Sequence, residues 1–191
     1  MPPLVDPVVP PGSLAGTAQP ELDGHGLRLR PWRPDDAPVL VAAYADPQIQ
    51  QWHARWMTRT EAERWIARAA ERWDDEAGAE WAVTAGGVVV GRAGLKRVGL
   101  AEGSGEVTYW VAPQSRRRGV ASGALDVLSD WAFHDLGLHR LELLHSVRNL
   151  ASCGVARRAG FAIEGTKREE ALHVDGWHDM HLHARLTERS G

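Results

Sequence analysis

The chain has 191 residues, 43% of them hydrophobic and 25% charged, a balance typical of one soluble globular domain with a substantial core. Its 22 lysine and arginine residues against 25 acidic residues give a net charge of −3, which argues against nucleic acid as a partner. The single cysteine, Cys153, excludes an internal disulfide bond and suits a reducing cytoplasm.

Residues 1–25 hold six prolines and neither lysine nor arginine. This composition supports neither the basic start of a signal peptide nor a helix, and no stretch of the chain approaches the length of a transmembrane segment. We therefore expect a flexible proline-rich tail over residues 1–25, one domain over residues 26–187 and a C-terminal tail over residues 188–191.

Residues 26–32 predict the first strand, and a helix to about residue 45 follows from the proline and acidic residues that open it. The next segment, residues 48–57, is polar but carries Trp52 and Trp56. Thr60 and Glu63 have the spacing of a capping box, which predicts a second helix from there to about residue 75.

Residues 80–85 and 88–95 predict a hairpin around two glycines. Residues 106–111 alternate as a half-buried strand does, and Pro113 ends that strand. A helix then begins near Arg118 or Gly119, with Gly137 as its C-cap. Residues 140–146 form the next strand, which the intervening helix makes parallel to residues 106–111.

A shorter helix over residues 149–159 and a hairpin of residues 161–173 and 177–186 complete the chain. The resulting order of elements, β-α-α-β-β-β-α-β-α-β-β, is that of an α+β domain.

The turn before the helix at Gly119 has the chemistry of an anion site. Small residues at Gly119, Ala121 and Gly123 leave the backbone N–H groups of the helix start unobstructed, and such a start attracts phosphate. A basic helix N-terminus that faces water would have the same residues from Arg116 to Ala121. This motif alone therefore does not distinguish a phosphate site from a solvated helix start.

The pattern Arg116-x-x-Gly119-x-Ala121 resembles the pyrophosphate loop of the GCN5-related N-acetyltransferase (GNAT) superfamily. The run Asn149-x-x-Ser152, followed by Gly160-Phe161 and Glu164-Gly165, resembles the RimJ/RimL ribosomal-protein acetyltransferase group within it. The resemblance covers residues 26–187, with each part in the expected order. It implies the GNAT fold: a mixed, mostly antiparallel seven-stranded sheet with a splayed pair of parallel strands and helices on both faces.

The resemblance also implies acetyl-CoA as co-substrate, with its pantetheine arm between strands 106–111 and 140–146. The backbone at Val111 would bind the arm, as a neighbouring strand would. Asn149 matches the residue that bonds the arm, although asparagine is also a common helix cap. The diphosphate would lie on the loop and helix start, formed by Arg116, Arg117, Arg118, Gly119, Val120, Ala121 and Ser122.

Transfer of an acetyl group from a thioester to an amine needs a neutral amine and a stabilised leaving thiolate. An α-amino group has a pKa of about 7.7–8.0, against about 10.4 for lysine, so it needs only a modest base. Glu106 is the candidate base, directly or through a water, or else a solvated carboxylate at a strand start. Ser152 is the candidate donor to the departing sulfur, or else a helix cap.

The resemblance places the two N-terminal helices along the acceptor site, which makes Trp52 and Trp56 candidates for substrate contact. Packing of either tryptophan against the sheet is the alternative that we favour. A protein N-terminal α-amino group is the leading acceptor and a small-molecule amine the next. Some relatives use succinyl-CoA, so the donor is open between acetyl and succinyl.

We expect no functional metal. His173, His178, His181 and His183 gather around the last hairpin, but no acidic or cysteine ligand pattern accompanies them. His183 occupies the position at which the family usually has a tyrosine, so the role of the family's tyrosine is not assigned to a residue of this chain. An acyl intermediate on Cys153 is disfavoured because the amine can attack the thioester directly.

The expectation is thus a cytoplasmic acyl-CoA-dependent N-acyltransferase that works through a ternary complex, without a membrane or nucleic-acid partner. Related proteins often dimerise, so a homodimer stays open. The alternative of a different class is an acyl-CoA-binding regulatory module without transfer activity.

Overall fold

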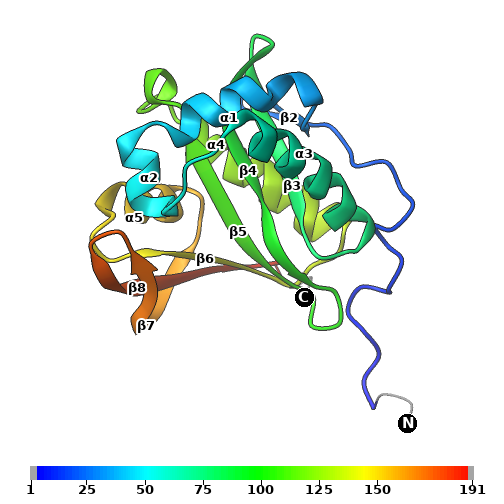
Figure 1. Cartoon of the computed structure of the whole chain (residues 1–191). Coiled ribbons are helices and arrows are strands. Elements are labelled where there is room, and N and C mark those ends of the chain that lie inside the picture. The colour runs from blue at the N-terminus through cyan, green and yellow to red at the C-terminus, as the bar shows by residue number, and fades with distance from the viewer. Residues whose placement is uncertain (1–3, 189–191) are drawn as a thin grey trace.

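The computed structural model describes residues 4–188; residues 1–3 and 189–191, which belong to the two expected tails, lie outside the described part. Within residues 4–188 the chain forms one eight-stranded sheet with the order β1-β2-β3-β4-β5-β6-β8-β7 (Figure 1). The strands are β1 Leu22–Gly24, β2 Leu27–Pro31, β3 Ala79–Ala85, β4 Val88–Gly99, β5 Ser104–Val111, β6 Arg140–Ser146, β7 Ala162–His173 and β8 Gly176–Leu186.

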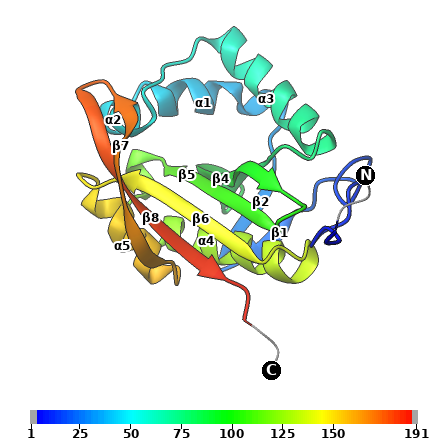
Figure 2. The ribbon, with the colours of Figure 1, turned by 90° about the horizontal axis from the view of Figure 1, so that it is seen from below.

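Helices cover both faces of this sheet (Figure 2). One layer holds α1 Ala37–Tyr44, α2 Pro47–His53 and α3 Arg59–Asp74, and the other holds α4 Val120–Asp130 and α5 Leu150–Arg158. Short helical turns flank them at η1 Pro34–Asp36, η2 Pro113–Ser115 and η3 Trp131–Asp135. Among residues 4–188, no helix combines the length and the apolar character needed to cross a bilayer.

Each face of the sheet has its own buried cluster. Trp32, Tyr44 and Trp110 pack together under α1 and α3. On the other face Leu125 and Leu128 of α4 are fully buried in a larger cluster. The sheet with a layer of helices on each face confirms the expected α+β fold.

The expected count of seven strands is wrong by one. Residues 22–24 form β1, which pairs antiparallel with β2 through Leu22↔Leu29 and Gly24↔Leu27. This strand was not predicted, because it has only three residues at the edge of the sheet and follows a proline-rich stretch.

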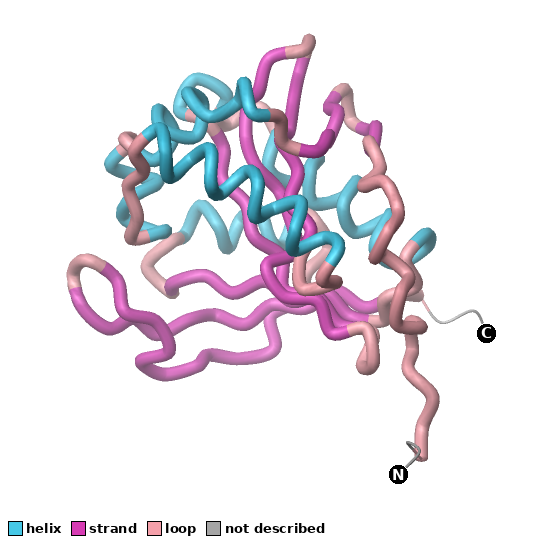
Figure 3. The backbone as a smooth tube through the Cα atoms, turned by 45° about the vertical axis from the view of Figure 1, so that its right-hand side comes forward, coloured by secondary structure: helices cyan, strands magenta, loops and turns pink. Residues whose placement is uncertain are grey.

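The segment before β1 packs against the domain rather than standing apart from it, running along its side as loop (Figure 3). Val9 and Leu14 are each only 2% exposed. The Glu76 carboxylate accepts hydrogen bonds from the backbone N–H groups of Gly12 and Leu14, both at 2.8 Å. These contacts differ from a loose tail over residues 1–25, because apolar side chains and backbone groups both find partners. The domain boundary itself stays a prediction.

The helix predicted to begin at the Thr60–Glu63 capping box is α3, and its N-cap lies two residues before the predicted one. Thr58 is the N-cap: its hydroxyl accepts from the backbone of Glu61, and the Glu61 carboxylate accepts from the Thr58 backbone at 2.7 Å. Thr58 and Glu61 have the same spacing as Thr60 and Glu63. The earlier pair is used because Met57 before it and Ala62 after it both enter the buried cluster, as in a hydrophobic staple.

Strands β5 and β6 are parallel, as expected, but only over their first halves. Their pairing runs from Ser104↔Arg140 to Val107↔Leu143. Beyond that point β5 continues beside β4 as far as Val111, while β6 continues beside β8 as far as Ser146. The two strands therefore part after Val107, and Figure 1 shows them diverging towards α2 and α5.

Candidate active site

The gap between β5 and β6 leaves backbone groups of β5 without a neighbouring strand. The Ala112 N–H donates to the Val90 carbonyl of β4 at 2.9 Å. The backbone groups of successive residues in a strand point alternately to its two sides. Since those of Ala112 point to β4, the backbone groups of Tyr109 and Val111 face the open side. The Val111 carbonyl accepts a hydrogen bond there from Arg116 Nε at 3.2 Å. The gap is thus an edge at which extended amides can bind.

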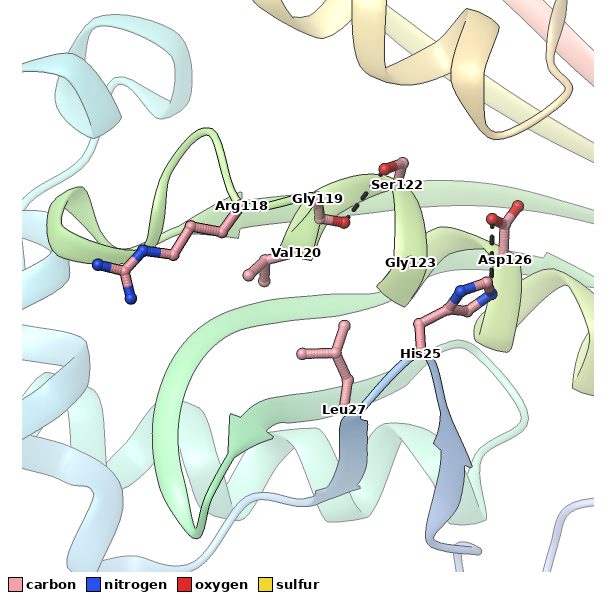
Figure 4. Close-up of a pocket in the computed structure, with 8 residues that line it drawn as sticks. All are labelled: His25, Leu27, Arg118, Gly119, Val120, Ser122, Gly123 and Asp126. Atoms are coloured by element: carbon pink, nitrogen blue, oxygen red, sulfur yellow. Dashed lines mark hydrogen bonds and ion pairs between the residues drawn. The ribbon is translucent and has the colours of Figure 1, made fainter.

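Helix α4 begins beside this gap with its N–H groups free. Arg117 and the N-cap Gly119 have φ values of 62° and 77°, which turn the chain sharply into the helix. The first N–H groups of a helix have no partner within it. A pocket of about 330 Å³ lies at this helix start (Figure 4), and its lining comprises His25, Leu27, Arg118, Gly119, Val120, Ser122, Gly123 and Asp126.

The three consecutive arginines are not equivalent. Arg116 donates to Asp46 Oδ1 at 2.6 Å and to Gln48 Oε1 at 2.5 Å, so its guanidinium is fixed on the start of α2. Burial alone would raise the pKa of Asp46, but the hydrogen bonds from Arg116 and from the Ile49 backbone hold it below its ordinary value. Arg117 and Arg118 are exposed, and Arg118 extends away from the helix start in Figure 4.

A pair of hydroxyl groups closes the gap from the side of α5. The Ser152 Oγ lies 2.6 Å from the Tyr109 hydroxyl. Asn149 is the N-cap of α5, because its Oδ1 accepts from the Ser152 N–H at 3.0 Å. The capping alternative thus belongs to Asn149, and the Ser152 hydroxyl pairs with Tyr109 instead of capping the helix. Burial raises the pKa of Tyr109 to about 12, which keeps its phenol neutral.

Tyr109 was not among the predicted site residues, because its hydrogen-bond partner Ser152 is 43 residues away along the chain. The available signal was alternation: Tyr109 points to the opposite face of β5 from Glu106 and Trp110. That face is the one against which the helix after β6 packs.

Glu106 lies on the face of α1 and α3, together with Trp110. Its side chain is largely buried, with Lys96 Nζ at 2.5 Å and Arg97 Nη1 at 3.5 Å from its two carboxylate oxygens. Glu106 and Ser152 thus belong to opposite faces of the sheet, on either side of the gap. Its role as a base stays a prediction, and the two cations give the carboxylate a structural partner as well.

A cleft of about 610 Å³ lies along α3 on the Glu106 side of the sheet. Lys96, the ion-pair partner of Glu106, belongs to its lining, and Trp56 stands at it with 68% of its surface exposed. Cations predominate over acids in the lining, which comprises Arg55, Trp56, Met57, Glu61, Arg64, Trp65, Arg68, Ala69, Arg72, Glu80 and Lys96.

The two predicted tryptophans separate. Trp52 of α2 packs edge-on against His173 and His178, with ring centroids 6.1 and 6.5 Å away. It joins α2 to the β7–β8 hairpin, as the packing alternative described. Trp56 lines the cleft along α3 instead, so it is the better placed of the two tryptophans to contact a substrate.

His53, the last residue of α2, was given no role by the sequence. Burial and the nearby Arg92 guanidinium lower its pKa to about 4, against a hydrogen bond to the Tyr109 backbone that raises it. The imidazole is therefore neutral at physiological pH and lies beside the open edge of β5.

The four predicted histidines form two groups rather than one. His173 and His178 stack with ring centroids 4.3 Å apart beside Trp52. His181 and His183 lie with His145 of β6 instead, because cross-strand pairing places His145 opposite His181.

A family model described as the acetyltransferase (GNAT) domain matches residues 26–162. The putative ribosomal N-acetyltransferase YdaF of Bacillus subtilis is 30% identical over 103 residues, which are 54% of this chain and 56% of YdaF. The match therefore spans about half the length of that relative.

Many solved structures share the fold, and RimL and RimJ are among them. RimL, described as a ribosomal L7/L12 alpha-N-protein acetyltransferase in complex with coenzyme A, superposes with a TM-score of 0.81 at 18% identity, covering 87% of this chain and 98% of RimL. Mycobacterium smegmatis RimJ, in complex with CoA-disulfide, gives 0.79 at 24% identity, covering 88% and 86%.

Proposed function

The chain belongs to the acetyltransferase (GNAT) family, and we propose that it transfers an acetyl group from acetyl-CoA to a primary amine, foremost a protein N-terminal α-amino group. The observation that carries this proposal is the parting of β5 and β6 after Val107, beside the free start of α4. A gap lined by backbone groups fits the amides of a pantetheine arm, and a helix start fits its diphosphate.

For the coenzyme, the proposed contacts are the Val111 backbone for the arm and the N–H groups of Val120, Ala121 and Ser122 for the diphosphate. In this proposal Arg117 and Arg118, which are exposed, turn to the phosphates and add charge-assisted bonds. Arg116 acts differently in this proposal: it bonds to Asp46 and thereby holds the turn before α4 against the start of α2.

In the proposed reaction the neutral amine attacks the thioester carbonyl carbon, a C–N bond forms and the C–S bond breaks. Glu106 accepts the proton of the amine, directly or through a water. The Ser152 hydroxyl, supported by Tyr109, donates a hydrogen bond to the departing sulfur. A thiol of pKa about 8.5 leaves with little need for protonation, so this last contribution is modest.

The charge of the α3 cleft favours a protein acceptor over the common small amines. Polyamines and aminoglycosides are polycations, and a lining in which arginine and lysine predominate disfavours them. A peptide carries one amine at its N-terminus, and acidic residues after it would complement the cleft. The names of YdaF and RimL point to protein acceptors in those relatives, and we extend this, with a cytoplasmic location, to the present chain.

The test is thiol release from acetyl-CoA and succinyl-CoA across a panel of acceptors. The panel contains peptides with free N-terminal serine or alanine followed by acidic or by basic residues, a lysine peptide with a blocked N-terminus, spermidine and an aminoglycoside. We expect release with free-N-terminus peptides, fastest with the acidic ones. Release with spermidine or the aminoglycoside alone would reject the protein acceptor and keep the acetyltransferase.

The rival of a different class is a coenzyme-binding module without transfer. Calorimetric binding of CoA combined with silence from every acceptor would favour it.

A further inference from the structure

Four side chains with metal-binding atoms converge between α5 and the end of the sheet. His145 comes from β6, His181 and His183 from neighbouring positions on one face of β8, and Cys153 from the first half of α5. One ligand atom from each lies within 4.8 Å of all the others. His145 and His183 are only 4% and 1% exposed.

The two buried histidines face each other through nitrogens that both carry lone pairs. His145 Nδ1 lies 2.8 Å from the Ser146 carbonyl, and His183 Nδ1 lies 3.2 Å from the Phe161 carbonyl. A carbonyl only accepts, so each Nδ1 carries the hydrogen, and in a neutral ring each Nε2 is then an acceptor. These two Nε2 atoms are 3.1 Å apart. Two acceptors at that distance repel unless a cation lies between or beside them.

The arrangement around each Nδ1 is the one that protein metal ligands show. A ligating histidine ordinarily donates its other ring N–H to a carbonyl or carboxylate, which fixes its tautomer and orientation. In addition, His181 Nδ1 is buried and has no hydrogen-bond partner among residues 4–188. Both observations point to a ligand that accepts nitrogen lone pairs.

We propose that His145, Cys153, His181 and His183 bind one zinc ion. Three imidazoles and a thiolate form a tetrahedral set that suits zinc. Zn–N distances of about 2.0–2.1 Å and a Zn–S distance of about 2.3 Å place tetrahedral ligand atoms about 3.3–3.6 Å apart. The present spacing of up to 4.8 Å reaches that value through small side-chain shifts. The Cys153 thiol loses its proton to solvent when the Zn–S bond forms.

With all four ligands from protein, the site would be closed and structural rather than catalytic. It would join α5 to β6 and β8 beyond the point at which β5 parts from β6. Helix α5 carries Ser152 and has Asn149 as its N-cap, so the ion would fix the helix that borders the gap. The sequence predicted no functional metal at the histidines of the last hairpin, because Cys153 and His145 are distant from that hairpin along the chain.

The first experiment measures zinc binding by protein purified without a histidine tag and stripped with a chelator. Titration with zinc in competition with a chromophoric chelator should give one ion per chain, and the bound ion should raise the unfolding temperature. Cys153→Ser and His145→Gln should each weaken binding by at least about tenfold, since loss of even an outer partner of a ligand costs about 10–100-fold. His134→Gln, which changes an exposed histidine outside the cluster, should bind as the wild type does.

The second experiment uses Co²⁺ in the unmodified protein and needs no variant to fold. A thiolate ligand gives a sulfur-to-cobalt charge-transfer band in the near ultraviolet, with the intense visible bands of a tetrahedral ion. We expect both in the wild type and loss of the near-ultraviolet band in Cys153→Ser.

Three results would overturn the proposal. One is the absence of stoichiometric zinc binding by the stripped wild type, which would leave a proton shared between His145 and His183 as the account of their contact. Another is zinc binding that Cys153→Ser and His145→Gln leave unchanged. The last is a cobalt spectrum without a thiolate band.

Discussion

The hydrogen bond between Tyr109 and Ser152 joins a strand and a helix that border the same gap. If Ser152 assists the departing sulfur, Ser152→Ala should lower kcat by about 10–100-fold with little change in KM, because the thiolate is already a fair leaving group. Tyr109→Phe should cost less, and the double variant should cost little more than Ser152→Ala, since the two hydroxyls act in series. Steady-state kinetics with a fixed peptide acceptor measures all three.

A loss above about a thousandfold in Ser152→Ala would mean that the serine has a larger role than hydrogen bonding to sulfur. Equal and additive losses in the two single variants would separate the hydroxyls functionally.

Glu106 can be tested apart from its ion pairs. Glu106→Gln keeps the shape of the side chain and removes the base, so kcat/KM should fall by about 10²–10⁴-fold. Lys96→Met removes one cationic partner but keeps the carboxylate. If Glu106 is only structural, both substitutions should lower the unfolding temperature and leave kcat near the wild-type value.

The sequence predicted the basic turn before α4 and the start of α5, but not the contacts that their residues make. Alternation along β5 predicted which residues share a face with Glu106. It could not predict that Tyr109 meets Ser152 or that Arg116 turns to Asp46, because such contacts depend on how distant elements pack.

The start of α3 shows how much of an element sequence can define. Thr58→Ala removes the observed N-cap and should reduce the free energy of unfolding by about 1 kcal/mol. Thr60→Ala is the matched control, because Thr60 is exposed within the first turn and should change stability by less than about 0.5 kcal/mol. Urea unfolding compares the two. A larger effect at Thr60 would contradict the cap assignment.

The helices and strands were largely predictable because periodicity and turn residues are local. The β3–β4 hairpin around Gly86 and Gly87 and the start of α4 at Gly119 followed from residues within each turn. The α3 start was displaced because two threonines had the same capping spacing, and burial of Met57 decided between them. Strand β1 was missed because pairing with β2, rather than its own composition, makes it a strand.

For the whole molecule, the Arg30–Asp36 pair predicts a loss of stability in acid. Burial raises the pKa of Asp36, but hydrogen bonds from Arg30 and from the Arg33 backbone outweigh it and hold the pKa below its ordinary value. A lowered folded pKa stabilises the protein above the unfolded value of about 3.9. That contribution is lost as the pH falls through the folded pKa.

Urea midpoints measured between pH 7 and pH 3 should therefore fall in the wild type below about pH 4. Asp36→Asn leaves Arg30 buried without its partner, so it should be less stable at pH 7 by about 3–5 kcal/mol and should lose less on acidification. An unchanged slope in this variant would show that Asp36 does not contribute to the acid response.

The segment before β1 should stabilise the whole domain. Its backbone accepts the indole N–H groups of two core tryptophans, Trp73 at Thr17 and Trp81 at Pro20, at 2.9 and 2.8 Å. Deletion of residues 1–20 leaves these indoles unpaired and exposes the apolar surface under Val9 and Leu14, so the unfolding temperature should fall by several degrees. Differential scanning calorimetry measures it. An unchanged value would show that the segment contributes nothing to stability.

The two edges of the sheet bear on how the protein behaves at high concentration. An open edge strand can recruit a strand of another chain and start aggregation. Strand β1 offers only three residues. Strand β7 is long, but its pairing with β8 shifts register twice, Glu169 takes a φ of 47°, and the charged run Lys167-Arg168-Glu169-Glu170 occupies the irregular part. Neither edge is a straight apolar template, so the chain can keep a wide sheet open at both ends without polymerising through it.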